Sequence, residues 1–247
     1  MPPTGVTADQ LTSGHAREYG RVMSWSAPTA VGTVRISTSS GSVHVIAERD
    51  RHEVTSSTGP ISGGDGPVTI DGGSSKVVAR VPEGTPLVIG STSGRVTIEG
   101  RVGAVSVVTA SGRISVAHAA SVDARSASGR IEVGRADGDC RVVATSGRVD
   151  IGSCGRADAA SASGRIVVRD AHGPVRANCT SGKIQLVMAG AHDVEAETVS
   201  GRIEVSFPDG VHPLVADSGA RDTIERSGHD CVVVARSGVG RVVVADR

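Results

Sequence analysis

Seven basic residues recur along this sequence, and each directly follows a Ser-Gly pair. The spacing from one to the next is 17 to 19 residues. If each repeat is one layer of a stack, equivalent residues lie about 4.8 Å apart, and such a row of positive charge attracts a polyanion. The row, called the basic ladder below, consists of Arg95, Arg113, Arg130, Arg148, Arg165, Lys183 and Arg202.

The same ladder has a second interpretation, in which the protein neutralises it internally. Carboxylates stand two residues after three of the arginines, as Glu132, Asp150 and Glu204. A second outward series alternates in sign from Asp123 onward, which favours one strand register; it runs Ser106, Asp123, Arg141, Asp158, Arg176 and Glu195. We favour the internal interpretation, because the ladder also lacks aromatic platforms on which nucleic-acid bases could stack.

Patterns typical of catalysis and of metal binding are weak. The eight histidines form no motif, and the sequence contains no GxSxG, HExxH or complete phosphate-loop pattern. The four cysteines form no CxxC pair and have no zinc-ligand spacing to histidine. We therefore predict that the protein is not an enzyme and has no catalytic residue, no cofactor and no metal site.

The elements that position these side chains follow from the repeat. The in-phase Ser-Gly pairs begin at Ser93, Ser111, Ser128, Ser146, Ser163, Ser181, Ser200, Ser218 and Ser237. Apolar or small residues stand six, four and two positions before nearly every Ser, with His212 as the exception before Ser218. Apolar residues stand three and five positions after most of them, and this is the alternation of a strand with one buried face. We predict an all-β fold, a parallel β-solenoid (β-helix) with 17–19-residue coils and two strands per coil.

Three of the cysteines fall in the inward positions of this pattern. Cys140, Cys179 and Cys231 are therefore expected to be small core residues. Cys154 stands in the looser turn between successive coils, where we expect it to be accessible to solvent. His118, His172 and His192 stand in the same turns, which places them near one edge of the predicted solenoid.

The repeat also predicts the domain organisation. Residues 1–22 lack any pattern and are either disordered or precede the true start at Met23. Residues 23–86 hold a first coil near 31–48 and then an irregular N-terminal cap, which protects the open strand edge. Residues 87–247 hold the repeats and continue the preceding segment as one elongated domain.

Both ends of the repeat region depart from the pattern. Within the cap, short strands are predicted at Val68–Ile70 and Lys76–Val81. Near the C-terminus a slipped register or a loop is predicted at residues 219–229, because Arg221 and Thr223 occupy inward positions. The final strand, Arg241–Ala245, is predicted to be an edge strand.

Composition excludes several functional classes. The 26 basic and 26 acidic residues balance, so no overall field attracts nucleic acid or a membrane surface. No apolar run approaches the length of a membrane-spanning helix, and the N-terminal residues do not resemble a signal peptide. Together with the spacing of the cysteines, which indicates reduced thiols, these features predict a cytoplasmic protein without membrane insertion.

The segment from Val34 to the C-terminus resembles a bacterial family of β-strand-repeat proteins that carry the label adhesin and contain a domain of unknown function. The resemblance rests on the opening "VRISTSSGSVHVIAERD", the entry "VPEGTPLVIGSTSGRVTIEG", the coils "ASGRIEV", "TSGRVDI" and "VSGRIEV", and the exit "VSFPDGVHPLVADSGA". It implies a β-solenoid with no known catalytic residue and no known cofactor.

These observations predict a non-enzymatic interaction or scaffold module. It would bind a protein partner or self-associate through the edges or faces of the solenoid. A polyanion-binding protein that uses the basic ladder is the alternative. A carbohydrate-active β-helix enzyme is the third hypothesis. It is the weaker one, because such an enzyme needs carboxylates clustered on one outward face, whereas the acidic residues of this sequence alternate with arginines.

Overall fold

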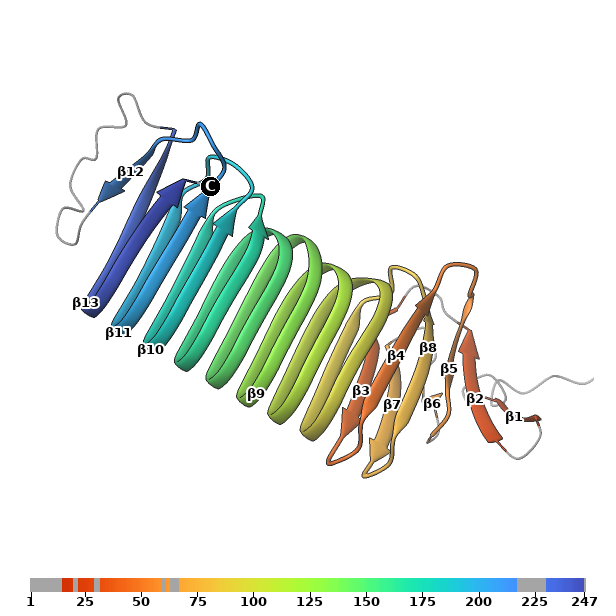
Figure 1. The fold of residues 1–247 in the computed structure, drawn as a ribbon. Coiled ribbons are helices and arrows are strands. Elements are labelled where there is room, and N and C mark those ends of the chain that lie inside the picture. Colours follow the sequence, from red (N-terminus) through yellow and green to blue (C-terminus); the bar gives the residue numbers. More distant parts are fainter. Residues whose placement is uncertain are drawn as a thin grey trace, which may run out of the picture.

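The computed structural model describes residues 15–19, 22–28, 32–58, 61–62, 67–216 and 230–246. Every regular element among them is a β-strand. Figure 1 shows these strands stacked side by side in one elongated array, with the chain winding repeatedly through its middle part. The fold is therefore all-β and solenoid-like.

The middle of the array is built from three long strands, β9 (Leu87–Ala171), β10 (Val175–Met188) and β11 (Val194–Phe207). Strand β9 winds several times through the stack (Figure 1). Strand β10 pairs in parallel with the end of β9 on one side and with β11 on the other. Ser181 lies opposite Ser163 and Ser200, so equivalent Ser-Gly pairs stand directly beside one another.

The apolar core follows the predicted alternation. Three positions after the Ser of each pair, Ile114, Ile131 and Ile166 are at most 1% exposed. Two positions before the Ser the buried residues are small, and several are hydroxyl residues. Most of those hydroxyls donate to the carbonyl two residues ahead, as Thr109 does to Ser111 at 3.0 Å and Ser126 does to Ser128 at 3.1 Å, so their burial leaves no unpaired donor. Thr198 is an exception, because its Oγ1 is buried and has no hydrogen-bond partner among the described residues.

The looser turns contain a further inward column that the sequence analysis missed. Its members are at most 2% exposed and recur at nearly the same spacing: Val102, Ala119, Ala136, Cys154, Ala171, Met188 and Phe207. The expectation that Cys154 is accessible was therefore wrong, since this side chain is 1% exposed. The turn is part of the core because strand structure continues through it in β9.

At the N-terminal end, the order of the strands in the stack differs from their order in the chain. Strands β3 (Val34–Thr38) and β4 (Val43–Glu48) pair in parallel with the start of β9. Strands β7 (Val68–Gly73) and β8 (Val77–Pro82) pair in parallel with the other side of β3 and β4. The strands predicted in these regions are present, but the chain order of the two layers is reversed in space.

Antiparallel strands follow beyond these two layers. Strand β5 (Glu53–Ser56) pairs with β8, and β6 (Ile61–Ser62) pairs with β7. Strand β2 (Val22–Pro28) pairs with β5, and β1 (His15–Tyr19) pairs with β2. Strand β1 falls within the segment that the sequence predicts to be disordered or upstream of the true start, and residues 1–14 lie outside the described part of the chain.

At the C-terminal end, too, the order of the strands in space differs from their order in the chain. Strand β13 (Cys231–Asp246) pairs directly with β11, and β12 (Pro213–Ala216) pairs with the outer side of β13. Strand β12, the described part of the predicted Ser218 repeat, therefore does not lie between β11 and β13 as predicted. The predicted loop or slipped register at 219–229 lies outside the described residues.

The corner of the last coil is also displaced from its predicted place. Gly240 lies opposite Gly201, whereas Ser237 lies opposite Thr198. Gly240 has a φ of +147°, like the other corner glycines, so it and not Gly238 forms the turn. The prediction of an in-phase Ser237-Gly238 corner was wrong, because β13 pairs with β11 in a register shifted by two residues, with Val233 and not Cys231 opposite Val194.

Candidate functional site

The corner glycines fix the position of every side chain that follows them. Gly147 has a φ of +134°, and a Cβ atom placed on it would lie 1.8 Å from the carbonyl oxygen of Gly129. The same close approach joins each corner glycine to the one before it from Gly112 to Gly201. Since only glycine fits this position, the backbone turns in the same way in successive coils, and the next residue points outward from the same place.

This geometry brings the basic ladder together as one row. Lys183 lies opposite Arg165 on one side and opposite Arg202 on the other. Arg241 lies opposite Arg202 and extends the ladder by one residue that sequence reasoning missed. The available signal was the Gly-Arg-Val sequence at 240–242, which was hidden because Val239, and not Ser, precedes the glycine.

The three predicted ion pairs within the ladder are present. Arg130 Nε lies 2.9 Å from Glu132 Oε1, and Arg148 Nη2 lies 2.9 Å from Asp150 Oδ2. Arg202 Nη1 lies 3.6 Å from Glu204 Oε1. Glu204 also accepts from Lys183 Nζ at 2.8 Å, and this hydrogen bond holds the pKa of its carboxyl below the usual range.

Asp150 is the most deeply buried carboxylate of this surface, at 5% exposure. Besides Arg148, it pairs with Arg169 through Oδ1, and Arg130 Nη2 lies 3.9 Å from Oδ2. Three guanidinium groups from neighbouring coils therefore converge on one carboxylate. The centre of the ladder is an internal charge network that favours the observed register.

The remaining arginines of the ladder differ in their surroundings. Arg95, Arg113 and Arg165 are exposed and form no ion pair with the residues that the structure describes. The residues two positions after them are Thr97, Ser115 and Val167, which bear no charge. Arg95 and Arg113 stand on consecutive coils, because Gly112 packs on Gly94. Arg95 and Arg113 are therefore two adjacent uncompensated charges at the β3–β4 end of the ladder, while Arg165 and Arg241, which also form no ion pair among the described residues, stand apart from them.

The second outward series pairs across coils in two of its steps. Arg141 Nε lies 3.9 Å from Asp158 Oδ2, and Arg176 Nε lies 2.8 Å from Glu195 Oε2. Asp123 pairs instead with Arg125 on its own strand, at 2.9 Å. The alternation of sign therefore supports stacking between two coils within β9 and between β10 and β11.

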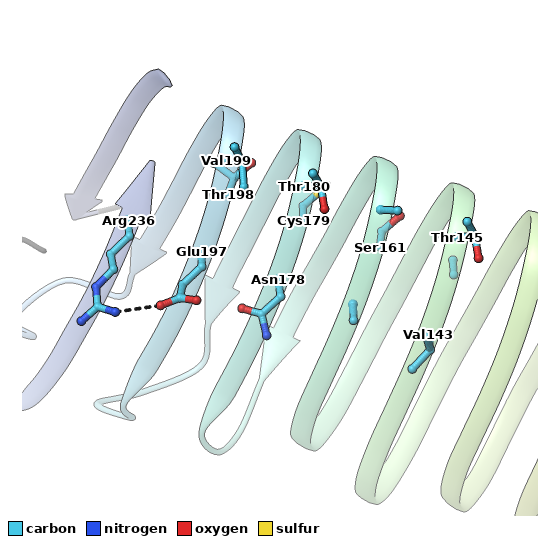
Figure 2. A pocket seen from close by; sticks show the side chains of 13 residues that line it. Val143, Thr145, Ser161, Asn178, Cys179, Thr180, Glu197, Thr198, Val199 and Arg236 are labelled. Atoms are coloured by element: carbon cyan, nitrogen blue, oxygen red, sulfur yellow. Dashed lines mark hydrogen bonds and ion pairs between the residues drawn. The ribbon is translucent and has the colours of Figure 1, made fainter. Parts of the chain in front are cut away.

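A shallow groove of about 630 Å³ crosses the stack just before the corners. It extends over successive coils from Val143 to Arg236, and its floor is small side chains such as Ala160, Ser161 and Ala162. Figure 2 shows Thr145, Asn178 and Thr180 along its length and the ion pair between Arg236 and Glu197 at one end. The Arg236 Nη1 to Glu197 Oε1 distance is 3.0 Å.

The groove combines weakly apolar and hydrogen-bonding groups. Val143 and Val199 are 36% and 64% exposed at its two ends. Hydroxyl and amide side chains lie between them, and the Arg236–Glu197 ion pair neutralises its own charge. Such a lining suits an extended polypeptide segment better than a strongly charged ligand.

The opposite edge of the coils holds a separate charge cluster around Asp137. Its carboxylate lies 2.8 Å from Arg135 Nε, 3.0 Å from His118 Nε2 and 3.2 Å from Arg101 Nη2. The hydrogen bond from Arg135, with help from His118, lowers the pKa of Asp137 to about 2. His172 pairs in the same way with Asp170, at 2.9 Å.

Thiol and metal chemistry find little support among the described residues. Burial raises the pKa of the Cys154 thiol to about 11 and raises the pKa of Cys140 even further. A thiol with such a pKa is a poor nucleophile at neutral pH. Within the described ranges, no group of three or more His, Cys, Asp or Glu side chains has an arrangement that could hold a metal ion.

Comparison with known families matches residues 72–218 to the Toastrack DUF4097 family. The match covers more than half of the chain, which therefore belongs to this family. No curated protein and no solved structure matches the chain. The described residues include no helix that is long and apolar enough to cross a membrane.

Proposed function

We propose that this protein is a non-enzymatic interaction or scaffold module, and that the groove from Val143 to Arg236 is its working surface. The observation that carries the proposal is the continuity of the groove over successive coils. Four coil steps of about 4.8 Å give a length of about 19 Å, which fits about six residues of an extended chain. The partner would be a protein segment whose small or apolar side chains contact the exposed valines.

The charge pattern supports a binding role over catalysis. Glycoside hydrolysis and related reactions need two carboxylates that are free to exchange protons. On the ladder side, Glu132, Asp150 and Glu204 are each engaged with a basic neighbour. We therefore retain the non-enzymatic proposal.

A photo-crosslinking amino acid at Thr180, which is exposed in the groove, tests the proposed function. We expect a discrete crosslinked protein when the labelled chain is incubated with extract of its native host. Adding Ala162→Arg should abolish that product, because a long charged side chain would fill the groove. Adding Ala127→Arg, at the equivalent exposed position outside the groove, should leave it unchanged. Equal labelling in both variants would contradict the proposal.

A second candidate function is the binding of a polyanion at the β3–β4 end of the ladder. The observation that favours it is the lack of carboxylate partners for Arg95 and Arg113 among the described residues. Binding of inorganic polyphosphate, used as the probe, should weaken steeply with salt. Arg113→Glu should reduce it, whereas Arg156→Glu, an exposed charge away from the ladder, should not. Salt-independent or absent binding would remove this candidate.

We also propose that the antiparallel strands β5, β6, β2 and β1 form a cap. Their support is that the parallel pairing stops at β7 and β8, where a further coil could otherwise add. Deleting residues 1–28 should increase aggregation and lower the melting temperature. Unchanged solubility and melting would contradict the capping role.

We further propose a reducing compartment, the cytoplasm, as the location of the protein. Cys140, Cys154 and Cys179 are buried and form no disulfide, which supports this proposal. Fractionation of the native host, with an antibody against the protein, would test it.

A further inference from the structure

The last strand of the stack has an edge that is only half covered. Strand β12 pairs with Cys231–Val234 at the start of β13. The rest of β13, from Val239 to Asp246, pairs with β11 on one side, and none of the described residues pairs with its other side. Figure 1 shows this strand at the end of the array, with β12 beyond its first half. Its outward N–H and C=O groups are a template for another strand.

The apolar core is open at the same place. Val242 occupies the inward column three positions after the corner serines and is 36% exposed. Its equivalents in the preceding coils, from Val96 to Ile203, are at most 1% exposed. Four of the six exposed large apolar side chains belong to β11, β12 or β13: Val199, Val215, Val239 and Val242. Exposed apolar surface gathered beside an unpaired edge is typical of an interaction site.

Among the described residues, the opposite end of the molecule presents a different kind of surface. There the parallel layers end in antiparallel strands, from β5 and β6 outward to β1. A head-to-tail arrangement of copies would have to place β13 against this different pairing. A closed pair of like ends avoids the mismatch, because each copy then supplies the same edge.

We propose that two copies of this protein associate tail to tail, with the β13 edges paired in antiparallel orientation about a two-fold axis. Inward positions must meet inward positions if the two cores are to join. Centring the axis on Val243 satisfies this condition and places Val242 of each copy opposite Val244 of the other. The open end of each core is then covered by its counterpart.

The charge of the edge also favours the antiparallel orientation. Arg241 is the charged side chain between Val239 and Ala245. In the register centred on Val243 it faces Ala245 of the other copy, and the two Arg241 residues stand four positions apart, about 13 Å along the paired edges. Parallel pairing in register would instead place the two arginines directly opposite each other, and like charges at facing strand positions destabilise a pair.

Sedimentation of the full chain over a range of concentrations tests the proposal. We expect a species of twice the 24.9 kDa chain mass to form as the concentration rises. Val242→Lys should shift the population to monomer. Val108→Lys, on an outward position that is 50% exposed in the middle of the stack, is the matched control and should leave the dimer intact. Circular dichroism would confirm that both variants retain strand structure.

A second variant tests the register and does not depend on the stability of Val242→Lys. Val243→Cys places two thiols across the two-fold axis with Cβ atoms about 4.5–5.5 Å apart, close enough to be oxidised to a disulfide after a small adjustment. Val239→Cys is the control, because two copies of it would lie about 26 Å apart along the paired edges. We expect rapid crosslinking of the first variant alone. Three results would overturn the proposal. They are a monomer at every concentration, an open-ended polymer, and a dimer in which the Val243→Cys variant does not crosslink.

Discussion

At the scale of single residues, the corner glycine controls the whole outer surface. Its left-handed backbone conformation turns the chain, and the absence of a Cβ lets the carbonyl of the preceding coil approach. The ladder residue that follows therefore points the same way in successive coils. The charge pattern of the surface depends on this one backbone position.

Gly147→Ala tests the role of the corner. The new methyl group would require both a strained φ and a clash with the carbonyl of Gly129, so we expect a loss of stability on the order of 3 kcal/mol. Gly90→Ala is the control, because Gly90 has neither a positive φ nor an atom within 4 Å of the added Cβ. Urea denaturation of both variants measures the difference, and equal stabilities would contradict the account.

The Asp137 cluster gives a prediction about pH. The pKa of Asp137 is lowered from 3.8 to about 2, so its contribution to stability is complete above about pH 4 and is lost as the pH falls through 2. The difference in urea midpoint between the wild type and Asp137→Asn should therefore shrink between pH 4 and pH 2. Thr180→Ala, at an exposed position, changes no ionisable group and should show no such trend. A constant difference across this range would argue against the ion pairs.

Much of the residue-scale picture could be predicted, since alternation and glycine spacing are local properties of the sequence. The buried isoleucines, the corner glycines and the Arg130–Glu132 pair follow from them directly. Cys154 could not be placed, because the turn that contains it has no clear alternation. Only the stacking of turn upon turn shows that Ala136, Cys154 and Ala171 form a buried column.

At the scale of the elements, the strands are stable only as neighbours. Each coil presents five or six inward side chains, and those of adjacent coils cover one another. An unpaired charge at an inward position therefore destabilises its own coil and the coils on both sides of it. The outward positions one residue away should tolerate the same change.

Ile166→Asp tests this contrast. Ile166 is 0% exposed between Val149 and Ile184, and an unpaired carboxylate there should cost more than about 3 kcal/mol. Val167→Asp places the same group outward, two residues after Arg165, where Glu132 stands relative to Arg130. We expect that control to change stability by less than about 1 kcal/mol. Similar melting of both variants would show that the inward assignment is wrong.

The order of the elements at the two ends could not be predicted from the sequence. The pattern of Val68–Ile70 fits a coil, but nothing local states that this coil lies outside β3. Likewise, Gly240 lies 39 residues after the glycine it faces, because β12 is placed outside β13. A periodic sequence specifies which faces are buried, whereas long-range pairing decides which layer is adjacent.

At the scale of the whole molecule, the stack is an elongated array of strands with a charged ladder and a groove near the corners. Its length grows by a fixed step with each coil, so distant positions are held at predictable separations. The groove could not be predicted as such. It arises because small residues at Ala160, Ser161 and Ala162 are aligned with similar residues on neighbouring coils.

The most direct test of the in-register stack is a distance between nitroxide labels at Thr92→Cys and Thr180→Cys, measured by double electron–electron resonance. Both positions are exposed just before a corner serine, five coils apart. Five steps of about 4.8 Å predict a single separation of about 24 Å, broadened by the label linkers. A mean separation far from this value, or a distribution without a preferred distance, would contradict the stacked arrangement on which the ladder, the groove and the free edge depend.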